Sequence, residues 1–176
     1  LHADEIPDIQ LLEQCVALVT EPVFLKIGLM DIREVVERAY MFHRGIPLER
    51  LLRVGDSLRL ARGVGELCSD LKRSGYDVVL VSAGVPQQVV ERIARDVGAD
   101  CAYGVLLEEN DGVLTGRLLG DRQSAHGKRV GLEGILRERG LSWSEATVVV
   151  DDTSNEEIVE AAEQIGPHDA CGARAR

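Results

Sequence analysis

Residues 147–162 read TVVVDDTSNEEIVEAA and combine a short apolar strand, two adjacent carboxylates, a polar turn and an amphipathic helix. An apolar run of this kind is typical of a strand buried in a parallel sheet. The carboxylates of Asp151 and Asp152 are then expected at the carboxyl edge of that sheet, where α/β proteins bind ligands. Two like charges so close together are easier to explain if a divalent cation lies near them. The competing interpretation is a solvated loop in which Asp152 or Ser154 caps the following helix.

The chain upstream of this stretch alternates between helix and strand patterns. The tripeptide Asn-Asp-Gly at 110–112 lies between two β-like runs and is a strong hairpin signal. In a helix over 127–139, Val130, Ile135 and Leu136 are expected to face the core. Alternation of this kind predicts an α/β fold with a parallel sheet and crossover helices. The expected elements are a helix from 64 to 74, a strand over 78–82, a turn at Ser82-Ala83-Gly84, a helix that opens at Pro86, a hairpin over 101–121, the helix over 127–139, a strand over 146–150 and a final helix.

The first part of the chain carries only helical signals. Residues 7–44 contain two apolar stripes at helical spacing, and Pro47 starts a third, short helix. The chain begins at Leu1 rather than methionine and ends in GPHDACGARAR, so both ends are expected to be cut or foreign to the domain. The expected division is a helical unit over 1–57, an α/β core over 58–166 and an irregular tail over 167–176.

Composition excludes several classes of protein. The formal net charge of −10 argues against broad nucleic-acid binding, which needs a cationic face. No apolar run approaches the roughly 20 residues that a membrane span needs. The four cysteines are scattered without a C-x-x-C pair, so neither a zinc site nor a disulfide framework is expected. Reduced thiols in the cytoplasm fit this pattern better.

Ser82 directly follows an apolar strand and precedes Ala83, Gly84 and the start of a helix. Its hydroxyl and the free amides of the helix N-terminus can point the same way, which suits the binding of phosphate oxygens. A simple turn serine is the alternative interpretation.

Lys128 lies at the start of the helix that follows the hairpin. A cation at this end is unfavourable to the helix dipole, which suggests another purpose, such as neutralising a bound phosphate. A solvated surface lysine is the alternative, and the adjacent Arg129 competes for the role. His126 is either a general acid or base or an exposed loop residue. Asn155 either positions a ligand or takes part in the turn before the final helix.

Read together, four pieces of sequence point to one family: the strand with Ser82-Ala83-Gly84, the hairpin NDGVLTGRLLGD, Lys128 with its helix, and VVVDDTSNEE. They resemble motifs two, three and four of the haloacid-dehalogenase superfamily, and most closely its phosphoserine-phosphatase-like subgroup. The pattern DGxLTGR is the most discriminating piece. The resemblance covers residues 58–165 and implies a Rossmann-like parallel sheet with a β-hairpin insertion and a small helical cap, the cap being the helical unit over 1–57.

The resemblance also implies an activity. It implies Mg²⁺-dependent hydrolysis of a small phosphorylated metabolite through an aspartyl-phosphate. Ser82 and Lys128 would be the catalytic residues that bind the phosphate and stabilise its charge, and Asp152, with Asp151 beside it, would hold Mg²⁺. Glu156 stands where the family usually has aspartate, and Asp151 where it has glycine. The substrate-binding positions would be Ser82, Ala83, Gly84, Lys128 and Asn155.

The nucleophile motif of the family, D-x-D-G-T on an apolar strand, is missing from the sequence. Asp4 and Asp8 are four residues apart, and no apolar strand precedes either of them. We therefore expect the sequence to start just after that motif. The chain would then lack a central strand and have little or no activity of its own, because aspartyl-phosphate formation needs a carboxylate in line with phosphorus.

Three other functions fit part of the pattern. A phosphotransferase of the same family would pass the phosphoryl group to an alcohol. A non-catalytic homologue would keep the phosphate pocket without the nucleophile. A receiver-like signalling domain also places paired acids at a strand end, but the hairpin and the helical unit argue against it. The substrate and the oligomeric state are open, and the candidate cap residues for substrate recognition are Glu21, Arg33, Glu37, Arg38 and Arg44.

Overall fold

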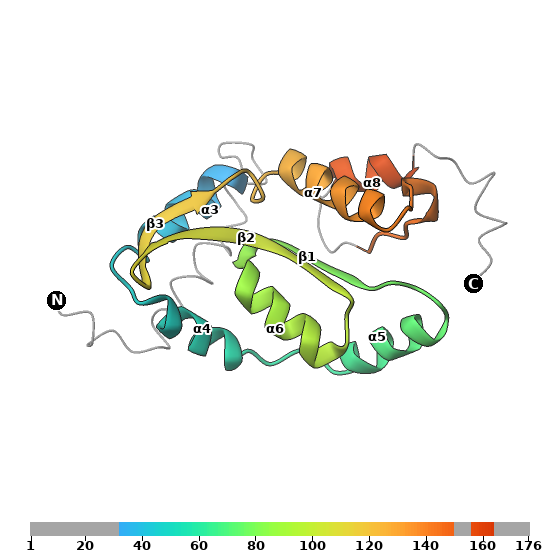
Figure 1. The fold of residues 1–176 in the computed structure, drawn as a ribbon, viewed down its shortest axis with the longest axis horizontal. Helices are drawn as coiled ribbons and strands as arrows, with labels where there is room; N and C mark the ends of the chain where they lie inside the picture. The colour runs from blue at the N-terminus through green and yellow to red at the C-terminus, as the bar shows by residue number, and fades with distance from the viewer. Residues whose placement is uncertain (1–31, 150–155, 164–176) are drawn as a thin grey trace.

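The computed structural model describes residues 32–149 and 156–163, and these form the α/β fold that the sequence predicts (Figure 1). Each expected helix within these ranges is present, and one expected strand is not. The elements are α3 (Ile32–Met41), α4 (Leu48–Asp56), α5 (Val64–Arg73), β1 (Val79–Pro86), α6 (Gln87–Val97), β2 (Cys101–Asn110), β3 (Val113–Leu119), α7 (Ala125–Glu138), a 3-10 turn (Trp143–Glu145) and α8 (Glu156–Glu163).

The described strands form one mixed sheet in the order β1-β2-β3. β1 pairs with β2 in parallel, from Val79 opposite Cys101, and β2 pairs with β3 in antiparallel fashion. Asp111 and Gly112 have φ values of 51° and 77°, the left-handed conformation that a tight hairpin turn needs. The hairpin prediction is confirmed, but its first strand is also the parallel neighbour of β1. The hairpin is therefore an extension of the parallel sheet.

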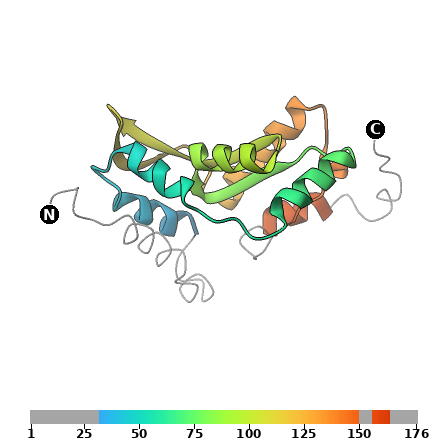
Figure 2. The ribbon, with the colours of Figure 1, turned by 90° about the horizontal axis from the view of Figure 1, so that it is seen from below.

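Helices cover both faces of this sheet. Figure 1 shows α3 and α7 on one face and α4, α5 and α6 on the other. Figure 2 shows α4, α6 and α5 following one another along their face. None of the described helices is long and apolar enough to cross a membrane. The layered arrangement leaves the carboxyl end of β1 between α3 and the first turn of α7.

The helices of the opening unit share most of their buried residues with the hairpin, apart from a small cluster of Ile46 and Val54. Val36 and Tyr40 of α3 and Leu51 of α4 pack against apolar side chains of the hairpin. The hairpin contributes three buried members to this cluster: Val105, Leu107 and Leu114. The helical unit thus shares its core with β2 and β3, and the boundary at residue 57 stays a prediction.

The expected strand over 146–150 is wrong for its described part. Residues 146–149 form no strand, and the side chain of Val149 is 93% exposed; residue 150 lies outside the described residues. A strand is stable only when a neighbour pairs with its backbone N–H and C=O groups. The described sheet ends at β1, so no described strand lies beside 146–149 to provide that pairing.

The orientation predicted for Val130 on α7 is also wrong. Its side chain is 50% exposed, whereas Ile135 and Leu136 are half-buried. The inner face of α7 instead carries glycines, and a Cβ on Gly131 would lie only 2.2 Å from the ring of Tyr103. The ring of Tyr103 thus lies close to the helix at Gly131, while Val130 lines the open space beside it and keeps half of its surface exposed.

The burial of His43, two residues after the end of α3, leads us to expect that stability depends on pH. Its ring is 3% exposed and its Nδ1 donates to the carbonyl oxygen of Ala39 at 3.0 Å. Burial lowers the pKa of His43, and the bond to Ala39 opposes that shift only in part. The unfolded chain therefore binds the proton more readily, so this contribution to stability falls as pH drops below about 6.5.

The measurement is the urea midpoint between about pH 7.5 and about pH 5.5, compared with the His43→Leu variant. We expect the variant to lose part of the slope with pH. His126→Gln is the control, because His126 is exposed. Equal slopes in the wild type and in His43→Leu would show that the burial of His43 does not control this dependence.

Candidate functional site

The carboxyl end of β1 presents the hydroxyl of Ser82. The Oγ atom accepts N–H bonds from Gly84 at 3.3 Å and from Val85 at 3.1 Å, and no described acceptor receives its own hydrogen. A hydroxyl held in this way can donate to a phosphate oxygen. No atom of the described residues lies within 4 Å of the Cβ position of Gly84, so they leave the space beside it open. The turn expected here is wrong, because β1 continues to Pro86.

The side chain of Gln87 explains why the strand continues. The pairing of β1 with β2 shifts between Val81 and Pro86. There the Gln87 amide takes the place of a backbone group: Nε2 donates to the oxygen of Ala102 at 3.1 Å, and Oε1 accepts from the N–H of Gly104 at 2.7 Å. The residues around Ser82 are thus held in extended form after they leave the ladder. Sequence reasoning missed Gln87, because it interpreted the helix start only through Pro86.

Lys128 lies in the first turn of α7 and is only 2% exposed. A lysine is seldom buried so deeply without a compensating group, so the surface-lysine interpretation is wrong. Arg129 is exposed and pairs with Glu133 at 3.0 Å on the outer face of the helix. Of the two adjacent cations, the structure therefore directs Lys128 inward, and His126 is exposed.

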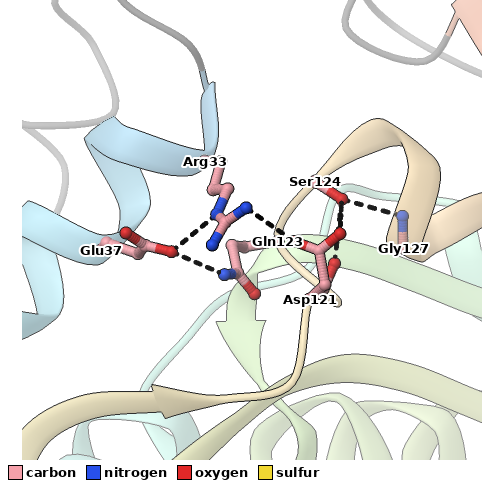
Figure 3. Close-up of polar contacts among 6 residues, drawn as sticks. All are labelled: Arg33, Glu37, Asp121, Gln123, Ser124 and Gly127. Carbon is pink, nitrogen blue, oxygen red and sulfur yellow. Dashed lines mark hydrogen bonds and ion pairs between the residues drawn. The ribbon is translucent and has the colours of Figure 1, made fainter.

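The first turn of α7 is fixed by a serine cap. Ser124 donates to the carboxylate of Asp121 at 2.6 Å, and its Oγ accepts from the N–H of Gly127 at 2.8 Å (Figure 3). Tyr103 adds a bond from its hydroxyl to the oxygen of Gly127 at 2.8 Å. Burial raises the pKa of Tyr103, so this hydroxyl keeps its hydrogen at neutral pH. Lys128 thus follows a rigid turn.

One face of α3 joins the end of β1 to this turn. The hydroxyl of Tyr40 donates to the carbonyl oxygen of Gly84 at 2.7 Å. One turn earlier, Glu37 accepts from Gln123 at 3.0 Å, and Arg33 lies 3.7 Å from Asp121 (Figure 3). The carboxyl end of β1 and the N-terminal turn of α7 therefore lie under the same helix.

The candidate cap residues differ in where they point. Arg33 and Glu37 face the turn before α7, whereas Arg38 is exposed and pairs with Glu34 at 2.5 Å. Arg33, and then Gln123, lower the pKa of Glu37, so this carboxylate is charged at neutral pH. Arg44 is exposed, and Glu21 lies outside the described residues.

The predicted metal ligands cannot be placed. Asp151, Asp152 and Asn155 lie outside the described residues. Within 32–149 and 156–163, no three His, Cys, Asp or Glu side chains converge on one point. The described residues alone therefore do not make a metal site, and the assignment to the two aspartates stays a prediction.

A cavity of about 570 Å³ lies between β2 and the glycine face of α7. Its wall includes Tyr103, Arg122 and Gly131, but neither Ser82 nor Lys128. Arg122 lies 4.6 Å above the centre of the Tyr103 ring and bonds to Gln87 at 2.9 Å. This cavity belongs to the packing of α7 on the sheet and borders the candidate site through Gln87, Asp121 and Gly127.

Several curated proteins are similar to this chain. A phosphoserine phosphatase of Archaeoglobus fulgidus is 34% identical over 132 residues, which are 75% of this chain and 38% of that protein. One of Streptococcus thermophilus is 30% identical over 129 residues, 73% of this chain and 59% of that protein. The chain thus spans less than two thirds of the length of these relatives.

Solved structures share the fold. A substrate-bound phosphoserine phosphatase complex superposes with a TM-score of 0.71 at 24% identity, over 86% of this chain and 73% of that one. A phospho-aspartyl intermediate analogue of phosphoserine phosphatase gives a TM-score of 0.68 at 25% identity, over 86% and 76%. The family model for haloacid dehalogenase-like hydrolases matches residues 5–155. By this match over most of its length, and by the fold that agrees with it, the chain belongs to the haloacid dehalogenase-like hydrolases.

Proposed function

We propose that this chain carries the phosphate-binding part of a Mg²⁺-dependent phosphomonoester hydrolase of the phosphoserine-phosphatase type. The observation that supports it best is the meeting of two elements under α3. One is the end of β1 with the donor hydroxyl of Ser82, and the other is the turn of α7 that buries Lys128. The relatives named phosphoserine phosphatase support the choice of substrate class.

The residues would act on the phosphate as follows. Ser82 would donate a hydrogen bond to one phosphate oxygen, and Gly84 leaves the space that the anion needs. Lys128 would balance the negative charge in a region shielded from water, where that interaction is stronger than in solution. Asn155 would contact the substrate from the turn before α8.

Magnesium, held by Asp152 with Asp151 beside it, would neutralise charge on the phosphoryl oxygens. The choice of metal follows from the donors, because carboxylate oxygens are the ligands that Mg²⁺ prefers. The division into a cap over 1–57 and an α/β core over 58–166 is part of the same proposal.

We also propose that the chain by itself turns over phosphomonoesters slowly or not at all. The sequence contains no D-x-D-G-T motif, and neither a hydroxyl nor an ammonium can form an aspartyl-phosphate. A phosphotransferase would share every described feature of the site. A non-catalytic homologue would also bind phosphate. It would differ because its natural full-length form would release no phosphate from a phosphomonoester.

The test is to measure the binding of inorganic phosphate by calorimetry, in the presence of MgCl₂. We expect the wild type to bind and Lys128→Met to bind about tenfold more weakly or worse, since a charge-assisted hydrogen bond contributes about 1.5–3 kcal/mol. Arg129→Met is the matched control, because it removes the adjacent, exposed cation. Equal losses in the two variants, or no binding by the wild type, would contradict the proposal.

Release of phosphate from O-phosphoserine with Mg²⁺ tests the proposed lack of turnover. We expect no release above the blank. Robust turnover that Asp152→Asn abolishes would show that the chain supplies a nucleophile from somewhere else.

A further inference from the structure

Gln123 is a polar residue buried in the turn between β3 and α7. Its side chain is 1% exposed, the same level of burial as the neighbouring catalytic candidate Lys128. Nε2 donates to Oε1 of Glu37 at 3.0 Å, across 86 positions of sequence. Oε1 of Gln123 is buried and has no hydrogen-bond partner in the described structure. The amide is thus only half satisfied.

Such an amide is a poor choice for stability alone. An unsatisfied buried acceptor costs about 1–3 kcal/mol, and an apolar side chain of similar volume avoids that cost. What the glutamine provides instead is a directional contact, because the bond that its Nε2 donates fixes the distance between the turn and Glu37. A second described link between the two segments is weaker. The Arg33–Asp121 pair is 3.7 Å long and about half-exposed on both sides, and such pairs contribute little.

A chain of short contacts runs from Gln123 to Lys128. Gln123 directly precedes Ser124, whose Oγ caps the N–H of Gly127 at 2.8 Å. The carbonyl oxygen of Ser124 accepts from the N–H of Lys128 at 3.0 Å. Figure 3 shows the beginning of this chain, with Gln123 bonded to Glu37 and Ser124 bonded to Gly127. A shift of the turn at Gln123 therefore moves the backbone of Lys128.

We propose that Gln123 is a positioning residue, which holds the first turn of α7 against Glu37 and thereby sets the place of Lys128 relative to the end of β1. This inference rests on the proposed function, since it gives the contact a purpose in binding phosphate. It also makes a structural claim that does not need activity. Glu37 serves as the anchor because α3 is itself tied to the end of β1 through Tyr40.

Two substitutions of Gln123 separate positioning from folding. Gln123→Met keeps an apolar side chain of similar length and removes the donor. Gln123→Glu keeps the shape but offers a donor only when the new carboxyl group is protonated. The charged groups that the described contacts place around it are Glu37 and Arg33 of α3 and Asp121 of the turn. At neutral pH the new carboxylate repels Glu37, and at low pH one proton shared between them restores the bond.

The measurements are phosphate affinity with MgCl₂ and hydrogen exchange of the Gly127 and Lys128 amides, each compared with the wild type at the same pH. At about pH 7.5 we expect both variants to bind phosphate about tenfold more weakly and to exchange these amides faster. At about pH 5 we expect Gln123→Glu to recover to within about twofold of the wild type, while Gln123→Met does not. The urea midpoint of Gln123→Met should be equal to or higher than that of the wild type.

The control is Glu34→Gln, which alters an exposed ion pair of the same helix that faces away from the turn. It should leave affinity and exchange unchanged. Unchanged affinity and exchange in both Gln123 variants, or losses in Gln123→Glu that low pH does not reverse, would overturn the inference. If the wild type binds no phosphate, the proposed function fails, and the exchange of the Lys128 amide alone decides whether Gln123 positions it.

Discussion

Replacing Gly127 with alanine is expected to lower the free energy of unfolding by about 3 kcal/mol or more. A Cβ at this position would lie 1.6 Å from the carbonyl oxygen of Asp121 and 2.4 Å from its carbonyl carbon. Both are backbone atoms, so no rotation of a side chain relieves the overlap. The turn must move away from α7, and the Ser124 cap on Gly127, with about 1 kcal/mol of its own, is lost with it.

The measurement is denaturant unfolding of the chain, with Gly134→Ala as the matched control. Gly134 lies two turns later in the same helix, and no described atom comes within 4 Å of its Cβ position. Alanine there should raise stability by up to about 1 kcal/mol, because glycine is a poor helix former. A similar change in both variants would show that the close approach of Asp121 to Gly127 does not constrain the helix.

Local elements could be predicted from the sequence because they depend on neighbours in the chain. The hairpin turn needs two residues with positive φ, and Asp111-Gly112 are residues that adopt it readily. α6 ends at Gly98, which has the left-handed φ of 74° that such a stop requires. Turn and cap residues act on the backbone within one turn of the chain. They therefore identify helices and hairpins correctly even when the packing is unknown.

The placement of Lys128 could be predicted only in part. A cation at the N-terminus of a helix is unfavourable, which made Lys128 unusual, but the same argument applied to Arg129. The two residues separate only when α7 is packed on the sheet, which buries one side chain and leaves the other with Glu133. α7 packs closely at Gly127 and Gly131, which add no apolar signal to the helical pattern, so Val130 was wrongly expected to face the core.

The network around Gln123 could not be predicted at all. Glu37 and Gln123 are far apart in sequence, and no motif in the residues around either of them indicates a contact. A buried glutamine looks the same in a sequence as an exposed one. The prediction of a strand over 146–150 was wrong for a related reason. The residues have the apolar pattern of a strand, but pairing also requires a neighbouring strand, and no described strand lies there.

Replacing Gly104 with alanine is expected to lower the free energy of unfolding by about 2–3 kcal/mol and to disturb the end of β1. A Cβ on Gly104 would lie 2.7 Å from the oxygen of Val85 and 2.9 Å from the nitrogen and Cα of Gln87. These backbone atoms belong to the junction of β1 and α6, directly after the Ser82–Gly84 segment. Moving them apart also breaks the bond from the N–H of Gly104 to Gln87.

Because the Gln87 amide bridges β1 and β2 where the ladder is interrupted between Val81 and Pro86, its loss loosens the residues that present the Ser82 hydroxyl. Phosphate affinity should therefore fall together with the urea midpoint in Gly104→Ala. Gly65→Ala, in the open first turn of α5, is the control and should raise the midpoint slightly without changing affinity. A lower midpoint with unchanged phosphate affinity would show that the Gly104–Gln87 contact supports the sheet but not the anion site, and that Ser82 is held by its own bonds to Gly84 and Val85 alone.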